Sequence, residues 1–156
     1  MRGSVPQGDL YGVFLMDDSE KCAGSRLAGT GSTVRAPVTT TLAANQVATL
    51  DFTLLKPNKQ ICSVRWSFTP VAGRTYLISG AAVGTTACAA RVMDMTNPDA
   101  IKVEATALRR NPAGGSSCVP LAQSKAASVA GADQSAPEAV LRQGAGAEDL
   151  QGLIGQ

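Results

Sequence analysis

The sequence predicts an all-β fold, an immunoglobulin-like antiparallel β-sandwich with a flexible C-terminal extension. Three observations predict it. Several segments alternate apolar and polar residues with the period of two that half-buried strands require. Clusters of Pro, Gly and Asn separate these segments at intervals of roughly ten residues. Four widely spaced cysteines, Cys22, Cys62, Cys88 and Cys118, can cross-link a small core.

The first 54 residues contain four candidate strands. Residues 11–16 form a continuous apolar run, which suits a strand in the interior of a sheet. Two weaker strands are predicted at residues 26–34 and 38–42. Residues 49–54 alternate regularly, so that one face carries Leu50, Phe52 and Leu54.

The strongest strand signal is at residues 61–69. One face of this segment carries Cys62, Val64, Trp66 and Phe68, and the other carries Ser63, Arg65, Ser67 and Thr69. Pro70 cannot donate a hydrogen bond to a ladder, and Gly73 closes a turn. The next strand is therefore predicted at residues 74–83.

Two further strands are predicted at residues 88–94 and 101–107. The first turns Cys88, Ala90 and Val92 inward, and the second alternates from Ile101 to Ala107. Six to eight short strands fit either a sandwich or a small barrel. We favour the sandwich, because an irregular strand count closes poorly into a barrel.

The cysteines predict a disulfide framework. Cys62 and Cys88 both face inward on different strands, so Cys62–Cys88 is the preferred bridge and Cys22–Cys118 remains. Four cysteines allow three pairings, and the other two stay open at this point. Disulfides require an oxidising compartment, and the alternative is four buried thiols in a cytosolic protein.

The chain divides into three parts. Residues 1–7 begin with Met-Arg-Gly-Ser, which is typical of an expression vector, so we expect these residues to be disordered or vector-derived. No apolar run of the length of a signal peptide follows them, so we also expect the native leader to be missing. Residues 8–120 form the predicted sandwich domain. Residues 121–156 form an Ala/Gly-rich tail with short helix-capable pieces at residues 136–142 and 148–154.

The second helix-capable piece is the candidate partner-binding element. Helical spacing places three apolar side chains on one face of it: Leu150, Leu153 and Ile154. A disordered terminus with incidental leucines, or a segment folded back on its own domain, explains the same residues.

The turn between the two central strands carries a resemblance. The spacing F-x-P-x-x-G-x-x-Y is formed by Phe68, Pro70, Gly73 and Tyr76, and the Tyr76 phenol can bond back to turn backbone as a tyrosine corner. Over about residues 39–96 the chain resembles small bacterial envelope lipoproteins and periplasmic β-sandwich proteins. The resemblance implies a sandwich located in the periplasm or at the outer membrane. A lipobox cysteine does not lead the chain, so membrane contact would need a lipid anchor that this chain does not carry.

The composition argues against most catalysis. The chain has no histidine, which removes the usual general base and the Ser-His and Cys-His nucleophile pairs. Carboxylates remain at Asp17, Asp18 and Glu20 and at Asp94 and Asp99, but scarce aromatic residues argue against a sugar cleft. We expect no enzyme activity, no metal and no cofactor. A net charge of +2 also predicts no nucleic-acid partner.

Three function classes follow. The first is a non-catalytic envelope domain that binds or scaffolds a protein partner. The second is a secreted inhibitor of an envelope hydrolase, presenting residues 111–117 as a loop on a cross-linked scaffold. The third is a carboxylate-dependent hydrolase that uses the acids named above.

Overall fold

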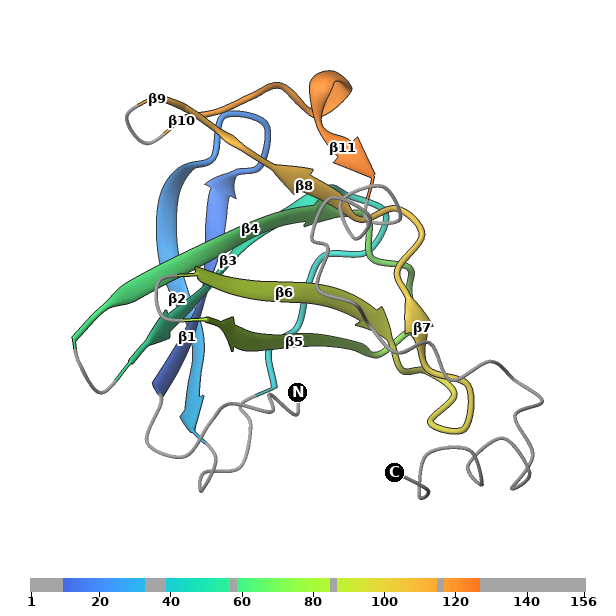
Figure 1. The fold of residues 1–156 in the computed structure, drawn as a ribbon. Helices are drawn as coiled ribbons and strands as arrows, with labels where there is room; N and C mark the ends of the chain where they lie inside the picture. The colour runs from blue at the N-terminus through green and yellow to red at the C-terminus, as the bar shows by residue number, and fades with distance from the viewer. Residues whose placement is uncertain (1–9, 33–38, 57–58, 85–86, 115–116, 127–156) are drawn as a thin grey trace, which may run out of the picture.

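Two antiparallel sheets pack face to face in the computed structural model of the chain (Figure 1). The larger sheet has the order β11-β8-β4-β3-β1-β2, and the smaller has the order β5-β6-β7. Strands β9 and β10 form a separate hairpin. The all-β prediction is confirmed. The structure describes residues 10–32, 39–56, 59–84, 87–114 and 117–126.

The element bounds are as follows. The larger sheet contains β1 (Leu10–Asp18), β2 (Ala23–Ser32), β3 (Ala48–Leu55), β4 (Ile61–Phe68), β8 (Leu108–Arg110) and β11 (Lys125–Ala126). The smaller sheet contains β5 (Tyr76–Val83), β6 (Ala87–Asp94) and β7 (Lys102–Val103). The hairpin consists of β9 (Pro112–Gly114) and β10 (Ser117–Cys118), and a short 3₁₀ helix, η1, spans Leu121–Gln123. Within the described residues, no helix has the length and apolarity that a membrane span needs.

The regular alternation at residues 61–69 becomes β4, as predicted. Val64, Trp66 and Phe68 are buried on the face that packs against the smaller sheet. The Trp66 indole N–H donates to the Ala90 carbonyl at 2.8 Å, which hydrogen-bonds the two sheets to each other. The predicted strands at 11–16, 26–34, 49–54, 74–83 and 88–94 correspond to β1, β2, β3, β5 and β6.

Two predicted strands are not formed as expected. Residues 39–42 are described and have no strand structure. The strand predicted at 101–107 is limited to β7, because the chain turns after it. The Glu104 carboxylate accepts from the Thr106 amide at 2.9 Å and from its hydroxyl at 2.8 Å, and the Ala107 amide bonds back to the Glu104 carbonyl. A local side-chain turn therefore replaces the alternating strand.

Phe52 on β3 is fully buried between the two sheets. Its ring lies over Gly80 on β5, where a Cβ atom would overlap the ring. Burial of a side chain of this size is worth about 1.5–3 kcal/mol. A side chain larger than hydrogen at Gly80 would push the sheets apart.

The turn between β4 and β5 forms the predicted tyrosine corner. The Val71 amide donates to the Tyr76 hydroxyl at 2.9 Å. The rings of Phe68 and Tyr76 pack edge to face, with their centroids 5.0 Å apart. The motif therefore fixes the passage of the chain from one sheet to the other.

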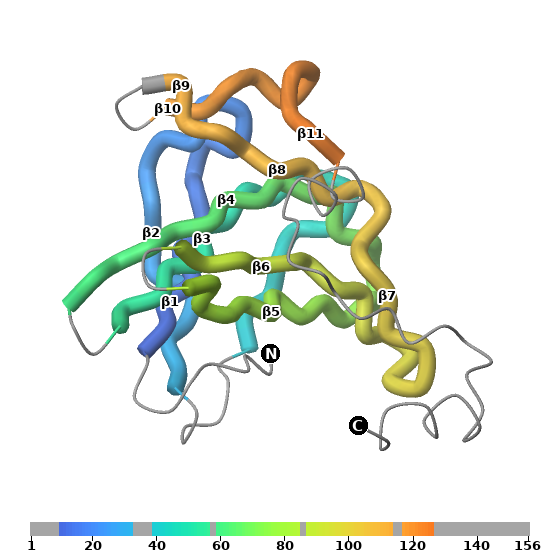
Figure 2. Tube along the Cα trace, in the orientation of Figure 1, coloured from blue at the N-terminus to red at the C-terminus, as the bar shows by residue number. Residues whose placement is uncertain are grey.

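The folded part continues past residue 120, where the sequence placed the end of the domain. The 3₁₀ helix η1 follows, and β11 then pairs with β8, with Ala126 opposite Leu108. Figure 2 shows this C-terminal segment, in orange, beside the blue turn between β1 and β2.

Candidate functional site

An apolar cavity lies between the two sheets on their β2 and β5 side, with a volume of about 140 Å³. Its walls come from both sheets and from the segment that precedes β3. The apolar side chains that line it include Val13, Leu15, Leu42, Leu50, Ile78 and Val92. Thr39, Thr40 and Thr75 also contribute to its lining.

The cavity exists because the sheets differ in width. Strand β6 packs over β4 and β5 packs over β3, and β5 is the last strand of the smaller sheet. The larger sheet continues past β3 to β1 and β2, so their inner faces extend beyond the edge of β5 (Figure 1). Residues 39–42 cover part of this face, held there by a hydrogen bond of 2.6 Å from the Thr40 hydroxyl to the Ala28 carbonyl.

The chemistry of this cavity is that of an apolar anchor site. The Thr40 hydroxyl donates to the Ala28 carbonyl, and the Tyr76 hydroxyl accepts from the Val71 amide, so both hydroxyls are engaged within the protein. A dry cavity of about 150 Å³ lined by aliphatic side chains accommodates a group the size of benzene. A single aromatic or branched aliphatic group therefore matches this cavity in size and polarity.

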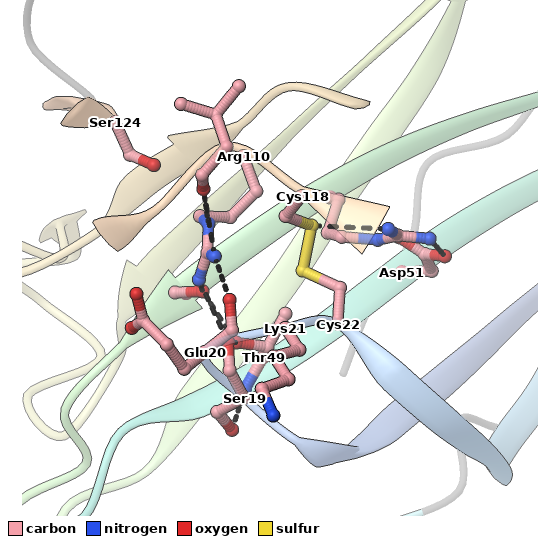
Figure 3. The surroundings of a disulfide bond; sticks show 12 residues. Ser19, Glu20, Lys21, Cys22, Thr49, Asp51, Arg110, Cys118 and Ser124 are labelled. Atoms are coloured by element: carbon pink, nitrogen blue, oxygen red, sulfur yellow. Dashed lines mark hydrogen bonds and ion pairs between the residues drawn. A yellow bond between two sulfur atoms is a disulfide. The ribbon is translucent and has the colours of Figure 1, made fainter. Parts of the chain in front are cut away.

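A second constellation, polar and buried, lies on the outer face of the larger sheet. The Arg110 side chain is only 2 % exposed. Its guanidinium donates to the carbonyls of Ser19, Glu20 and Val119 and to the Ser67 hydroxyl, at 2.6–3.2 Å (Figure 3). Burial lowers the pKa of Arg110, and the Glu20 carboxylate opposes that shift.

The Arg110 cluster acts as a structural tie. It fastens the turn after β1 and the segment after β10 onto the sheet. Thr49 and Ser67, whose hydroxyls share a hydrogen bond of 2.6 Å, become fully buried beneath it. All buried polar side-chain atoms in the described residues have partners, so this cluster has no group left free to bind a ligand.

Both bridges preferred from the sequence are present. Cys22–Cys118 closes the Arg110 cluster on one side, with a Cα separation of 5.6 Å (Figure 3). Cys62–Cys88 joins β4 to β6 across the two sheets, with a Cα separation of 6.0 Å. Two disulfides indicate an oxidising compartment.

An ion pair borders the first of these bridges. The Arg65 guanidinium makes a two-point contact with the Asp51 carboxylate at 2.5 and 2.6 Å, and it also reaches the Cys118 sulfur at 3.2 Å. The hydrogen bond with Asp51 raises the pKa of Arg65. The pair lies between neighbouring strands and serves to hold β3 and β4 in register.

The acids considered for catalysis do not converge. Asp17 pairs loosely with the exposed Arg26 at 3.6 Å, and Asp18 accepts from two amides of its own turn. Glu20 accepts from the Leu121 amide. In the part of the chain that the structure describes, no three such residues gather as they would around a metal ion.

The acids near the β6 end also stabilise turns. Asp94 accepts from the Thr96 amide at 3.0 Å and from Arg74 at 3.1 Å, and the Thr96 hydrogen bonds together with Arg74 lower the pKa of Asp94. The Asn97 side chain caps the amide of Asp99. A carboxyl kept ionised in this way is suited to holding a turn rather than to donating a proton.

The predicted partner-binding residues Leu150, Leu153 and Ile154 lie outside the described residues. The predicted inhibitor loop at 111–117 forms the hairpin of β9 and β10, whose tip at 115–116 also lies outside them. The cavity was not anticipated from the sequence, because its lining comes from segments that show no common pattern.

Comparison with protein-family models, curated proteins and solved structures finds no match to this chain. The fold and the bridges therefore define its class: an all-β domain of two antiparallel sheets, cross-linked by two disulfides. An apolar cavity lies where the larger sheet extends beyond the edge of β5.

Proposed function

We propose that this protein is a non-catalytic binding domain of the bacterial cell envelope, whose cavity receives an apolar side chain of a protein partner. The observation that carries the proposal is the aliphatic cavity of about 140 Å³ between β1, β2 and β5. A pocket that encloses one anchor side chain is the usual centre of binding energy in a protein interface. We place the domain in the periplasm or at the outer membrane.

The location is supported by two features. Both disulfides need an oxidising compartment, which the periplasm provides. The turn built on Phe68, Pro70, Gly73 and Tyr76 resembles that of small envelope lipoproteins.

The immunoglobulin-like character of the sandwich is also a proposal. An inter-sheet disulfide, Cys62–Cys88, and the tyrosine corner at Tyr76 support it. The hairpins β1–β2 and β3–β4 lie side by side in one sheet, with β1 next to β3. The proposed likeness to the immunoglobulin fold therefore rests on the inter-sheet disulfide and the tyrosine corner, and not on the order of the strands.

The anchor is tested by filling the cavity. Ala28→Leu adds aliphatic volume to the lining, and Ala81→Leu adds the same volume at an exposed position of β5. Each variant, once its melting temperature shows that it folds, is used to capture proteins from a native envelope extract. We expect a partner retained by the wild type and by Ala81→Leu and lost by Ala28→Leu. A partner retained equally by both variants contradicts the proposal.

A second candidate is the secreted inhibitor of an envelope hydrolase, and one observation favours it. The hairpin β9–β10 carries exposed Pro112 and Ala113, and its base is fixed by the bridge at Cys118 and by a bond of 3.0 Å from the Val119 amide to the Asn111 carbonyl. An exposed hairpin whose base is fixed in this way suits the blocking of an active site. Inhibition assays with envelope proteases and lysozymes, using Ala113→Glu as the matched variant, separate this function from the first.

A further inference from the structure

An exposed apolar patch lies on the outer face of the larger sheet, away from the cavity. Leu10, Leu55 and Ile61 are direct register partners on β1, β3 and β4, so they form one row across the sheet. Phe14 and Leu27 form a second pair between β1 and β2 on the same face. We call these five side chains the outer patch. Leu10 is 52 % exposed, Leu27 56 %, Leu55 38 % and Ile61 67 %.

The patch occupies the half of the outer face that the described chain leaves uncovered. At the other end of the same strands, Thr49 and Ser67 are fully buried under the Arg110 cluster. The ion pair between Arg65 and Asp51 lies in the same row as Phe14, which is the register partner of Asp51, and this row is the limit of the patch. A group of neighbouring apolar side chains that includes exposed leucines and isoleucine marks an interaction surface rather than an ordinary solvated face.

We propose that the segment of residues 148–154 docks on the outer patch of its own chain. Helical spacing gives this segment one apolar face of Leu150, Leu153 and Ile154. Such a short helix is unstable alone and needs an apolar surface to form. Its two acids, Glu148 and Asp149, precede the apolar face, and exposed Lys59 lies at the Ile61 end of the outer patch.

The length of the chain beyond Ala126 fits this docking. Ala126 on β11 lies opposite Leu108, which lies opposite Ser67, so two strand spacings separate Ala126 from β4. From that point Ile61 is about 22 Å away and Leu10 about 28 Å away, using ordinary strand dimensions. A coil of about 21 residues, the length of 127–147, has a root-mean-square span of about 23–27 Å.

This agreement has an energetic consequence. A tether whose average span matches the distance between its sites gives a millimolar effective concentration. An interaction of only millimolar affinity is then enough to keep the segment on the patch about half of the time. The inference goes beyond the proposed function, because the outer patch and the cavity lie on different surfaces.

Photo-crosslinking in the full chain tests the proposal. Benzoylphenylalanine is placed at Ile61, and as a control at Ile101, an exposed aliphatic residue between β6 and β7. Trypsin releases residues 143–156 as one peptide, because Arg142 is the last basic residue. We expect this peptide to crosslink to position 61 at least about tenfold more than to position 101, independently of protein concentration.

A second variant makes the result decisive. Replacing Leu150, Leu153 and Ile154 by Ser changes no residue of the described sheets, and it should reduce the crosslink to the level of the control. A crosslink that persists in this variant overturns the proposal. So does a crosslink that grows with protein concentration, which indicates a second copy, and so does a crosslink of position 61 to another protein alone.

Discussion

Removal of the Arg110 guanidinium should destabilise the fold strongly. Arg110→Met keeps most of the apolar stem but removes donors that serve three backbone carbonyls and the Ser67 hydroxyl. Each acceptor left buried without a partner costs about 1–3 kcal/mol, and breaking a buried charged network costs about 3–5 kcal/mol in all. We therefore expect a loss of about 3–5 kcal/mol in the free energy of unfolding.

The assay is equilibrium urea unfolding with the disulfides intact. Thermal unfolding should show a decrease of about 12–20 °C, since about 4 °C corresponds to 1 kcal/mol in a domain of this size. Arg109→Met is the matched control, because Arg109 is the neighbouring arginine and lies over the Trp66 ring at 5.7 Å. Loss of that contact should cost only about 0.5–1 kcal/mol.

The prediction depends on the burial of the Arg110 bonds. If Arg110→Met and Arg109→Met lose the same stability, or if Arg110→Met loses less than about 1 kcal/mol, the carbonyls of Ser19, Glu20 and Val119 are satisfied by water. The buried Arg110 cluster would then not hold the two segments onto the sheet.

Three further predictions concern other parts of the fold. Asp94→Asn should lower the melting temperature at pH 7, and the difference from the wild type should shrink below about pH 4. The reason is that the lowered pKa of Asp94 in the folded state contributes stability, which is lost as the carboxylate is protonated. A difference in melting temperature that does not depend on pH counts against this. Replacing both cysteines of the Cys22–Cys118 bridge by Ala should lower the free energy of unfolding by up to about 4.7 kcal/mol, and the same change at Cys62–Cys88 should lower it by up to about 3.5 kcal/mol. The first loss is larger because that bridge spans 96 residues and the second spans 26. Urea unfolding that gives the reverse order contradicts the loop-closure reasoning. Gly80→Ala should cost about 1–3 kcal/mol through overlap with the Phe52 ring, and adding Phe52→Leu should recover part of that loss; a neutral Gly80→Ala would show that the sheets separate easily.

The sequence predicted the strands that bury one apolar face against the other sheet. Residues 61–69 and 49–54 alternate because one face packs on the smaller sheet, and both are strands in the structure. The bridge Cys62–Cys88 was preferred because both cysteines were placed on inward faces, and it joins the two sheets.

The sequence could not predict features that depend on contacts between distant segments. Ser67 lies on the polar face of its strand, opposite the face that carries Trp66, yet it is fully buried, because Arg110 comes from 43 residues further along the chain to cover it. The alternation at residues 101–107 suggested a strand, but a hydrogen bond between neighbouring side chains turned the chain instead. The pattern of apolar residues contains neither kind of information.

The cavity also could not be predicted from the sequence. Val13, Leu15, Ile78 and Val92 all read as ordinary core residues, because each faces inward on its strand. The space between them arises from the number of strands in each sheet and from the path of residues 39–42. Neither can be read from local periodicity.

The central claim is that this cavity accepts an apolar group from solution. Titration of methyl-labelled protein with toluene, followed by NMR, tests it most directly. We expect saturable shifts confined to methyl groups of the lining, such as Val13, Leu42 and Ile78, and their loss in Ala28→Leu. Shifts absent from these methyls, or equally large at exposed Ile61, would contradict the account.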